Sequence, residues 1–502
     1  MEKDSRRGKI KDAPAPEVVK HLIKPWIETG LDYTYQVYLD INKAHVLMLA
    51  KQGIIANDVA QQILKVTDEM AKMGDVPTFP LDTSREDLYF NLEHYLIEHT
   101  SLEVGGQQHT ARSRNDLIAT GARLTTRKFY LEVCELYNRL RQTIIDLAKR
   151  NTDAVMSGYT HLQPSEPITF AHYCSAILAV MERDYQRLSN VYNGLNRCPL
   201  GGGSMGSTTF KIDRQMTSDL LGFDRPLDNS IDCVASRDYG VEFLAALAMM
   251  TNTFSRLCTD LYVWATPDYG YVEVEDSVAV CSSIMPQKKN PWTLEAVKGK
   301  AAQVEAALNS ALNAMKNTPF TLTLDGACGS LDLLPAAVET TKSCTDLMIA
   351  TLRGLKLNKD RMLKTAMSNF CTVTELANYL VRHDKISFRS AHEIVALVVD
   401  YMITHEKRAD EIGVDVVNGF FMELFNQKSS MTDADVQEAL NPALTVRAKN
   451  VLGGPAETEV VKQLEARQAQ LDRDRAEYAT RVQALKFAKD HLEMCVAKAI
   501  QG

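Results

Sequence analysis

Apolar residues recur every three or four positions along most of this chain, which is the spacing of helices that bury one face. The longest such stretch covers residues 117–149 and contains no proline. Residues 170–192, 234–264, 292–315 and 331–355 carry the same pattern. All five stretches greatly exceed the mean helix length of about 12 residues. Residues 170–181 are apolar on several sides, so we expect a helical bundle that continues across a subunit interface.

Shorter patterns flank the long ones and indicate the domain organisation. Residues 35–51, 57–72 and 85–99 predict short helices, a second group follows residue 359, and residues 458–499 predict a charged, exposed helix. Strand signals are few, at residues 271–280 and 320–324. We therefore predict an all-α fold with three domains. These are an N-terminal helical domain (1–116), a central long-helix bundle (117–360) and a C-terminal helical domain (361–502).

Charge and cysteine usage narrow the class of protein. The 56 basic and 64 acidic side chains leave a net charge of −8 without a basic block, which argues against nucleic acid or an anionic membrane as a partner. Residues 1–11 lack the apolar core of a signal peptide. The longest apolar runs, such as residues 243–250, fall far short of the roughly 20 residues of a membrane span. The 10 cysteines form no Cys-x-x-Cys pair, so a reduced, cytoplasmic protein is expected.

Three connecting segments carry more polar and ionisable side chains than the short loops of a helical bundle usually do. Residues 105–116 place Arg112, Ser113, Arg114 and Asn115 at the start of the longest helix. Two guanidinium groups beside hydroxyls and amides at a helix N-terminus suit carboxylate binding. The alternative is a capping segment with solvated arginines.

The second segment, residues 158–167, holds Thr160 and His161 in a loop bounded by prolines, where a histidine can act as or orient a general acid or base. The third, residues 281–291, combines Ser282, Lys288 and Asn290 between prolines that exclude a helix. Hydroxyls beside ammonium groups suit a base that must lose its proton. A structural histidine and a basic surface loop are the alternatives.

Other apparent motifs do not carry function in this reading. Residues 201–208 have the glycine spacing of a phosphate loop, but Ser207 stands where lysine is required, so we interpret them as a plain loop. No group of histidines, cysteines or carboxylates has metal-ligand spacing, and neither a metal nor a cofactor is expected.

Together and in this order, the three segments resemble the signature regions of the fumarase/aspartase superfamily. Residues 282–291 are the most diagnostic, and residues 110–116 and 158–163 are closer to argininosuccinate lyase than to fumarase or adenylosuccinate lyase. The similarity covers about residues 85–456, including 229–232, 237–238, 376–382, 388–395 and 453–456. The resemblance implies a homotetramer whose central helices form a tetrameric core, with each active site shared by three subunits. It also implies elimination of an amine from an N-substituted aspartate, a small dicarboxylate, with release of fumarate.

The resemblance and the chemistry of this elimination together suggest a role for each residue. Ser282 is the expected base, with Ser283 as the fallback, and Lys288 would favour its alkoxide. His161 is expected to protonate the leaving amine or to position the group that does. The expected substrate-binding residues are Arg112, Ser113, Arg114, Asn115, Thr160, Met285, Asn290, Trp292 and Leu322.

Departures from argininosuccinate lyases concern mainly the amine side of the substrate. Residues 31–35 do not match the segment that touches substrate in those enzymes, Trp292 replaces an aspartate, and an acidic, hydrogen-bonding stretch is replaced by residues 322–328. Apolar replacements leave a guanidinium group unpaired, so we expect a different amine, such as an aminopolycarboxylate of the ethylenediamine-disuccinate type. Cys281 replaces a glycine common at the start of the third region, which is expected to alter loop flexibility.

Two alternatives stay open. One is a genuine argininosuccinate lyase of arginine biosynthesis. The other is a catalytically silent, crystallin-like structural homologue, against which stands the retention of Thr160, His161, Ser282, Lys288 and Asn290.

Overall fold

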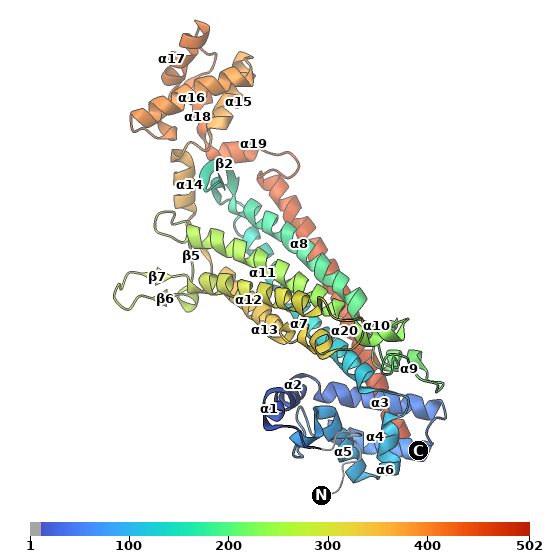
Figure 1. Cartoon of the computed structure of the whole chain (residues 1–502). Coiled ribbons are helices and arrows are strands. Elements are labelled where there is room, and N and C mark those ends of the chain that lie inside the picture. Colours follow the sequence, from blue (N-terminus) through green and yellow to red (C-terminus); the bar gives the residue numbers. More distant parts are fainter. Residues whose placement is uncertain (1–11) are drawn as a thin grey trace.

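Long helices dominate the computed structural model, which describes residues 12–502 (Figure 1). The segment 1–11, read above as lacking a signal peptide, lies outside the described residues. The predicted long helices are present and form an elongated bundle: α7 (Arg114–Lys149), α8 (Phe170–Leu195), α11 (Asp238–Trp264), α12 (Trp292–Met315) and α13 (Leu334–Arg353). The stretch expected as one helix over 234–264 is interrupted, because α10 (Ser230–Ala235) ends before α11 begins. The all-α prediction is confirmed.

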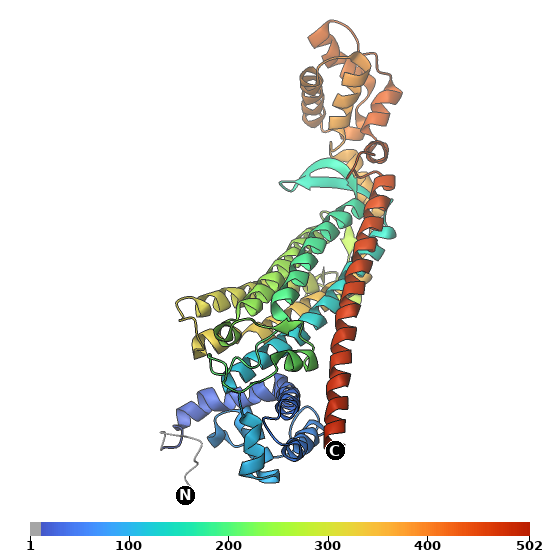
Figure 2. The same ribbon diagram turned by 90° about the vertical axis from the view of Figure 1, so that its right-hand side faces the viewer.

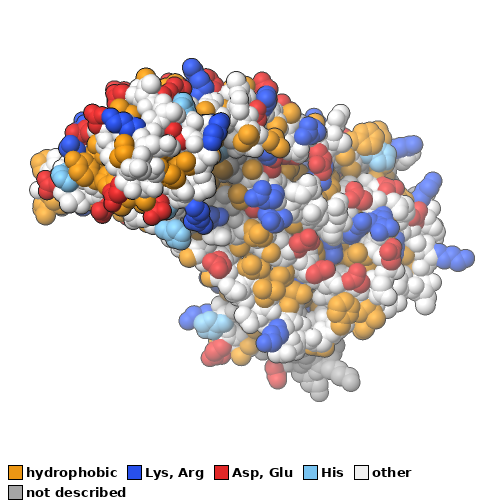
Figure 3. Space-filling model, turned by 90° about the horizontal axis from the view of Figure 1, so that it is seen from above, with side chains coloured by type: hydrophobic (Ala, Val, Ile, Leu, Met, Phe, Trp, Pro, Cys, Tyr) orange, Lys and Arg blue, Asp and Glu red, His pale blue; other side chains and the backbone are white. Residues whose placement is uncertain are grey.

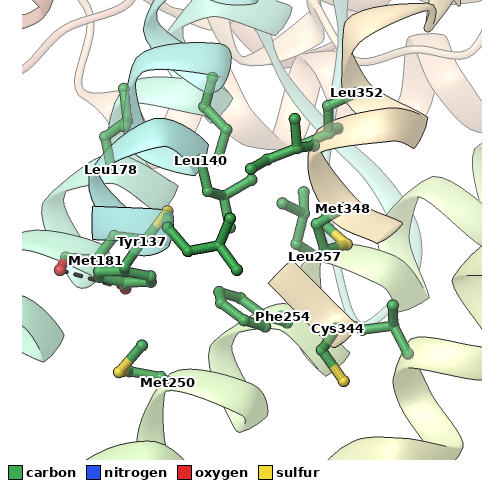
Figure 4. Close-up of a cluster of buried hydrophobic side chains, with 14 of the residues drawn as sticks. Tyr137, Leu140, Leu178, Met181, Met250, Phe254, Leu257, Cys344, Met348 and Leu352 are labelled. Atoms are coloured by element: carbon green, nitrogen blue, oxygen red, sulfur yellow. Dashed lines mark hydrogen bonds between the residues drawn. The ribbon is translucent and has the colours of Figure 1, made fainter. Parts of the chain in front are cut away.

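The bundle is held by a continuous apolar core (Figure 4). Figure 4 shows side chains that converge from four helices: Tyr137 and Leu140 (α7), Leu178 and Met181 (α8), Met250, Phe254 and Leu257 (α11), Cys344, Met348 and Leu352 (α13). The Tyr137 hydroxyl donates to the Met181 carbonyl at 3.3 Å, so this buried polar atom is satisfied. Burying each such apolar side chain contributes about 1.5–3 kcal/mol, which makes the bundle a rigid support for the segments at its ends.

The N-terminal group of helices packs around a second core. It comprises α1 (Pro16–Val18), η2 (Val19–Ile23), α2 (Lys24–Tyr33), α3 (Tyr35–Lys51), α4 (Asn57–Ala71), η3 (Thr83–Arg85), α5 (Leu88–His99), α6 (Leu102–Gly105) and η4 (Gly106–His109). Its core also includes residues that lie far away along the chain. These are Leu220, the last residue of α9 (Arg214–Leu220), Phe223 just after it, and Leu492 and Val496 near the C-terminus. This second core is therefore not made by residues 1–116 alone, and the proposed domain boundaries stay predictions.

The C-terminal part divides into a compact group and one long helix. A third core lies within α15 (Val373–Asp384), α16 (Phe388–Thr404), α17 (Val414–Phe425) and α18 (Asp433–Leu440), at one end of the molecule in Figure 1. Around this group lie α14 (Lys359–Ser368), η7 (Ala409–Glu411) and α19 (Pro442–Ala448).

The last helix, α20 (Glu457–Gln501), runs back along the bundle to the N-terminal group (Figure 2). The prediction that this helix is exposed is only partly right. Leu464 and Leu471 are buried, and Asp474 forms a buried ion pair with Arg141 of α7 at 2.6 Å. The high charge of the helix concealed this narrow buried stripe.

Within residues 12–502 the strands form four two-stranded pairs at the ends of helices. They are β1 (Val155–Thr160) with β2 (Gln163–Thr169), β3 (Arg197–Cys198) with β4 (Arg225–Pro226), β5 (Val272–Glu273) with β8 (Lys356–Leu357), and β6 (Val280–Cys281) with β7 (Lys289–Asn290). The strand predicted over 271–280 survives only at its two ends, because η5 (Asp276–Val278) intervenes. The strand predicted over 320–324 is wrong: this stretch finds no partner strand and leads into η6 (Asp325–Gly329).

No helix within residues 12–502 is both long and apolar enough to cross a bilayer. On the face shown in Figure 3, basic and acidic side chains are interspersed rather than gathered into patches of one sign.

Candidate active site

The first segment forms the N-terminus of α7, which two reciprocal hydrogen bonds stabilise. Ser113 caps α7: its hydroxyl accepts from the Asn115 N–H at 3.2 Å, and its own N–H donates to Asp116 at 3.0 Å. This reciprocal arrangement is a capping box, which satisfies donors that a helix N-terminus leaves unpaired. Ser113 and Asn115 are both partly exposed at this end of the helix. The predicted carboxylate-binding pair therefore lies at the positive end of a 36-residue helix.

Arg112 is buried behind this helix start. One guanidinium nitrogen donates to the Tyr89 hydroxyl at 3.1 Å, and the group lies 5.5 Å from the centre of the Tyr89 ring. Its Nε and Nη1 atoms are buried and, within residues 12–502, have no hydrogen-bond partner. Buried N–H groups without an acceptor are costly, so Arg112 retains donors that fit an anion.

Arg114 has different surroundings. It forms ion pairs with Glu86 at 3.2 Å and Asp87 at 3.0 Å, and it lies 4.3 Å from the centre of the Phe90 ring. Both carboxylates belong to the turn before α5 or to its N-cap, so Arg114 ties α7 to α5. Of the two arginines predicted to contribute charge to substrate, this one is already neutralised by protein partners.

Two histidines beneath the first segment are held neutral. Burial and the nearby Arg112 keep the pKa of His45 well below its usual value. Its Nε2 lies 2.9 Å from the Thr110 carbonyl and, in the neutral ring, must carry the proton. The Nδ1 of His109 lies 2.8 Å from the Tyr89 hydroxyl, and burial with Arg112 and Arg114 lowers the pKa of His109 to about 4.

The low pKa of His109 predicts a loss of stability in acid. The unfolded chain takes up this proton near pH 6.5 and the folded chain only near pH 4, so stability is full above about pH 6.5 and falls between these values. Because the side chain is 37% exposed, we expect a loss of only about 1 kcal/mol. The thermal midpoint of His109→Gln should fall less than that of the wild type between pH 7 and pH 5. Equal falls would contradict this assignment.

The second segment is a β-hairpin, where the sequence predicted an irregular loop. Thr160 pairs with Gln163, which leaves His161 and Leu162 as a two-residue turn with φ of 55° and 58°. Positive φ at both central residues is typical of type I′ turns, which usually contain Asn-Gly. A non-glycine residue there costs about 1–2 kcal/mol, and such strain clusters at functional sites.

The hairpin presents its tip to solvent. Thr160, His161 and Leu162 are exposed, and the hairpin projects sideways from the bundle (Figure 2). Close to this tip, the Tyr159 hydroxyl lies 2.6 Å from that of Tyr271 and ties the hairpin to the bundle. The two-stranded ribbon tolerates Pro164 and Pro167, because each strand has one free edge where a missing N–H breaks no ladder hydrogen bond.

The third segment is a loop, residues 282–288, closed by the β6–β7 pair. The Ser282 oxygen accepts from the N–H groups of Ile284 at 3.3 Å and Met285 at 3.1 Å. Donors aimed at this oxygen stabilise its negative form more than its neutral form. Ser283 is exposed and has no hydrogen bond of this kind within the described chain. The local geometry favours Ser282 over Ser283 as the base.

Two adjacent lysines in this loop differ in their partners. Lys289 pairs with Glu273 at 2.8 Å and Asp276 at 2.6 Å, whereas Lys288 is exposed and forms no ion pair within residues 12–502. Lys289 thus fastens the loop, and Lys288 keeps its charge for another group.

This difference predicts unequal effects of removing the two charges. Lys288→Met should lower kcat by about 100-fold or more if its charge stabilises the developing anion. Lys289→Met, the matched control, should lower the thermal midpoint with a smaller loss of kcat. A larger kcat loss in Lys289→Met would reverse the assignment.

The remaining predicted contacts lie at opposite ends of one helix. Met285 and Trp292 are 38% and 53% exposed, the latter at the start of α12. Leu322 lies beyond the other end of α12, in the irregular stretch before η6. Cys281 has no positive φ and pairs in β6, so a glycine is not required at that position. Asn290 pairs in β7 at the base of the loop.

Within one chain the three segments do not meet. The 36 residues of α7, about 54 Å at 1.5 Å per residue, separate the first segment from the hairpin. The 24 residues of α12, about 36 Å, separate Trp292 from Leu322. The structure therefore brings the second and third segments to one end of the bundle and leaves the first at the other. A single site that uses all three needs more than one copy of the chain.

The sequence reading missed two groups that hold the first segment. One is the set of His45, Tyr89 and His109, of which His45 and Tyr89 are buried. The other is Asp116, whose second carboxylate oxygen accepts from the N–H groups of Gly201 and Gly203 at 2.9 and 3.0 Å. The spacing Ser113-x-x-Asp116 is typical of a capping box, so it is the sequence signal that could have identified Asp116. Nothing local in the sequence indicated its link to the glycine loop.

Comparison with known proteins identifies the family of this chain. A family model described as "Lyase" matches residues 29–305, and one described as "Argininosuccinate lyase C-terminal" matches residues 370–447. The chain is 44% identical to "Argininosuccinate lyase 1" of Shouchella clausii, over 99% of both chains. It is 35% identical to the argininosuccinate lyase of Methanocaldococcus jannaschii, over 97% of this chain and 98% of that one.

Among solved structures, EDDS lyase in complex with formate superposes with a TM-score of 0.88 at 31% identity, over 98% of this chain and 97% of that one. A class II fumarase from Schistosoma mansoni shares the fold, with a TM-score of 0.64 at 16% identity over 82% of this chain and 90% of that one. The chain therefore belongs to the lyase family of the fumarase/aspartase superfamily, is argininosuccinate lyase-like, and is a carbon–nitrogen lyase.

Proposed function

We propose that this enzyme eliminates an amine from an N-substituted aspartate and releases fumarate. The observation that supports this most is the Ser282 loop, in which two backbone N–H groups point at one hydroxyl oxygen and Lys288 carries an unpaired charge nearby in sequence. A proton beside a carboxylate is weakly acidic, so the base must be strong and the carbanion must be stabilised.

The proposed elimination passes through a carbanion. The Ser282 alkoxide takes the proton from the carbon beside one carboxylate, and the electron pair delocalises into that carboxylate, held by Lys288 and Asn290. The pair then forms the double bond of fumarate as the C–N bond breaks. The departing nitrogen takes a proton supplied or positioned by His161. Ser113, Asn115, Thr160 and the free donors of Arg112 would hold the carboxylates.

The proposal includes a homotetramer with sites shared by three subunits. The separation of the three segments along the bundle supports sharing. Apolar side chains on the outside of the bundle support association. Ala176 is exposed and Val180 half-buried on α8, and Met249 and Leu312 are 44% and 50% exposed on α11 and α12.

The released amine is proposed to be other than arginine, of the ethylenediamine-disuccinate type. In a shared site, Trp292 of one subunit and Leu322 of another would offer apolar surface where a guanidinium would need acidic or hydrogen-bonding partners. The solved EDDS lyase structures of similar fold support the same amine class.

A genuine argininosuccinate lyase is the second candidate. It is favoured by the 44% identity to a relative of that name, which exceeds the 31% identity to EDDS lyase. A silent structural homologue is disfavoured because the Ser282, Lys288 and His161 side chains are all present and accessible or hydrogen-bonded as the reaction requires.

Ultraviolet absorbance of fumarate tests the reaction class in the reverse direction. The enzyme with fumarate and ethylenediamine should consume fumarate, and the product should carry a new C–N bond by mass spectrometry. A panel of primary amines, arginine included, extends the test. The proposal would be overturned, and the silent homologue favoured, if the enzyme consumed no fumarate with any amine and released none from N-substituted aspartates.

A further inference from the structure

We infer that the turn Ser204–Met205–Gly206 is a fourth part of the active site and binds a carboxylate of the substrate through its backbone N–H groups and the Ser204 hydroxyl. This rests on the proposed function, because it names a further contact for the same dicarboxylate. The turn belongs to the glycine-rich stretch 201–208, which the sequence reading set aside as a plain loop.

The turn lies directly beside the first segment. The side-chain amide of Asn115 donates to the Ser204 carbonyl at 3.0 Å. Asn115 is itself a predicted substrate contact, so a carboxylate held there is within reach of the turn.

Asp116 joins the turn to the start of α7. One carboxylate oxygen accepts from the Ser113 N–H, and the other accepts from the N–H groups of Gly201 and Gly203. The side chain is buried, with no exposed area. The same carboxylate therefore fixes the helix start and the loop in one relative position.

The loop is closed tightly enough to be preorganised. The Ser207 N–H donates to the Gly202 carbonyl at 2.8 Å, and the Ser207 hydroxyl donates to the Gly201 carbonyl at 3.0 Å. Gly203 has φ of 63°, and a Cβ there would lie 2.6 Å from the Ser207 carbonyl oxygen. Only glycine fits this approach, so the chain closes on itself below an exposed apex.

The apex has the character of an anion site. Ser204, Met205 and Gly206 are exposed, and within residues 12–502 none of their three N–H groups donates to a protein acceptor. Successive free N–H groups in a turn form a concavity that favours anions. Residues 201–212 contain no aspartate or glutamate to oppose a carboxylate.

Fumarate binding measured by isothermal titration calorimetry tests this inference on the full-length enzyme. Met205 is 40% exposed, so a side chain of similar length should fit there. Met205→Glu places a negative charge at the apex, and Met205→Gln is the uncharged control of the same shape. We expect the Kd for fumarate to rise at least tenfold in Met205→Glu relative to Met205→Gln, with equal thermal midpoints. Ser204→Ala should raise it by about threefold to tenfold.

The outcomes separate the two proposals. If the wild type binds fumarate and the Glu and Gln variants bind it equally, the turn is not part of the site. If Met205→Glu does not fold, an unchanged Kd in Ser204→Ala overturns the inference instead. If the wild type does not bind or turn over fumarate, the proposed function falls, and the inference falls with it.

Discussion

Ser282→Ala should leave a folded protein that has lost nearly all turnover. The substitution removes the hydroxyl that we propose takes the proton, and general-base contributions of this kind amount to about 10²–10⁴-fold in kcat. The hydroxyl lies in a partly exposed loop outside the three apolar cores, so the thermal midpoint should change little. Initial rates of fumarate release and a thermal melt measure both effects.

Ser283→Ala is the matched control for this variant. Ser283 is exposed in the same loop but does not receive the Ile284 and Met285 N–H groups. It should retain kcat within about tenfold of the wild type. If Ser283→Ala is dead and Ser282→Ala is active, the loop presents the other hydroxyl and the assignment of the base is wrong.

Mixing two inactive variants should restore activity. Ser282 and Asn115 lie at opposite ends of the bundle, so a site that contains both takes them from different chains. A hybrid of Ser282→Ala and Asn115→Ala chains can therefore contain sites in which both residues are wild type. With random assembly of equal amounts, about one quarter of sites are intact.

The experiment needs exchange of subunits and a control for it. The two purified variants are dissociated together, allowed to reassemble, and assayed for fumarate release. Ser282→Ala treated alone, and Ser282→Ala mixed with Lys288→Met, should stay inactive, because Ser282 and Lys288 belong to one loop of one chain. A mixture of Ser282→Ala and Asn115→Ala that stays inactive despite confirmed hybrids would contradict a shared site.

Helix periodicity predicted most of the fold, because long apolar repeats leave few alternatives to a bundle. The second segment shows the limit of this approach. His161 and Leu162 lack the glycine or asparagine that normally signals a tight hairpin, and two prolines argued against strands. Tertiary contacts, such as that between Tyr159 and Tyr271, override these local preferences.

The sequence allowed candidate site residues to be named, and these stay predictions, but it did not reveal the residues that hold them in place. Ser282, Lys288 and His161 stand out by type and order in the sequence. The distinction between Arg112 and Arg114, or between Lys288 and Lys289, depends on partners such as Tyr89 and Glu273 that lie far away along the chain. Local pattern carries no information about such partners.

The amine is the central claim, and parallel cleavage of two substrates tests it most directly. Argininosuccinate and ethylenediamine-disuccinate would be offered side by side, and kcat/KM for fumarate release compared. We expect kcat/KM for ethylenediamine-disuccinate to exceed that for argininosuccinate, because Trp292 and Leu322 give a guanidinium no partner. A clear preference for argininosuccinate would contradict the rebuilt amine side and make this an enzyme of arginine biosynthesis.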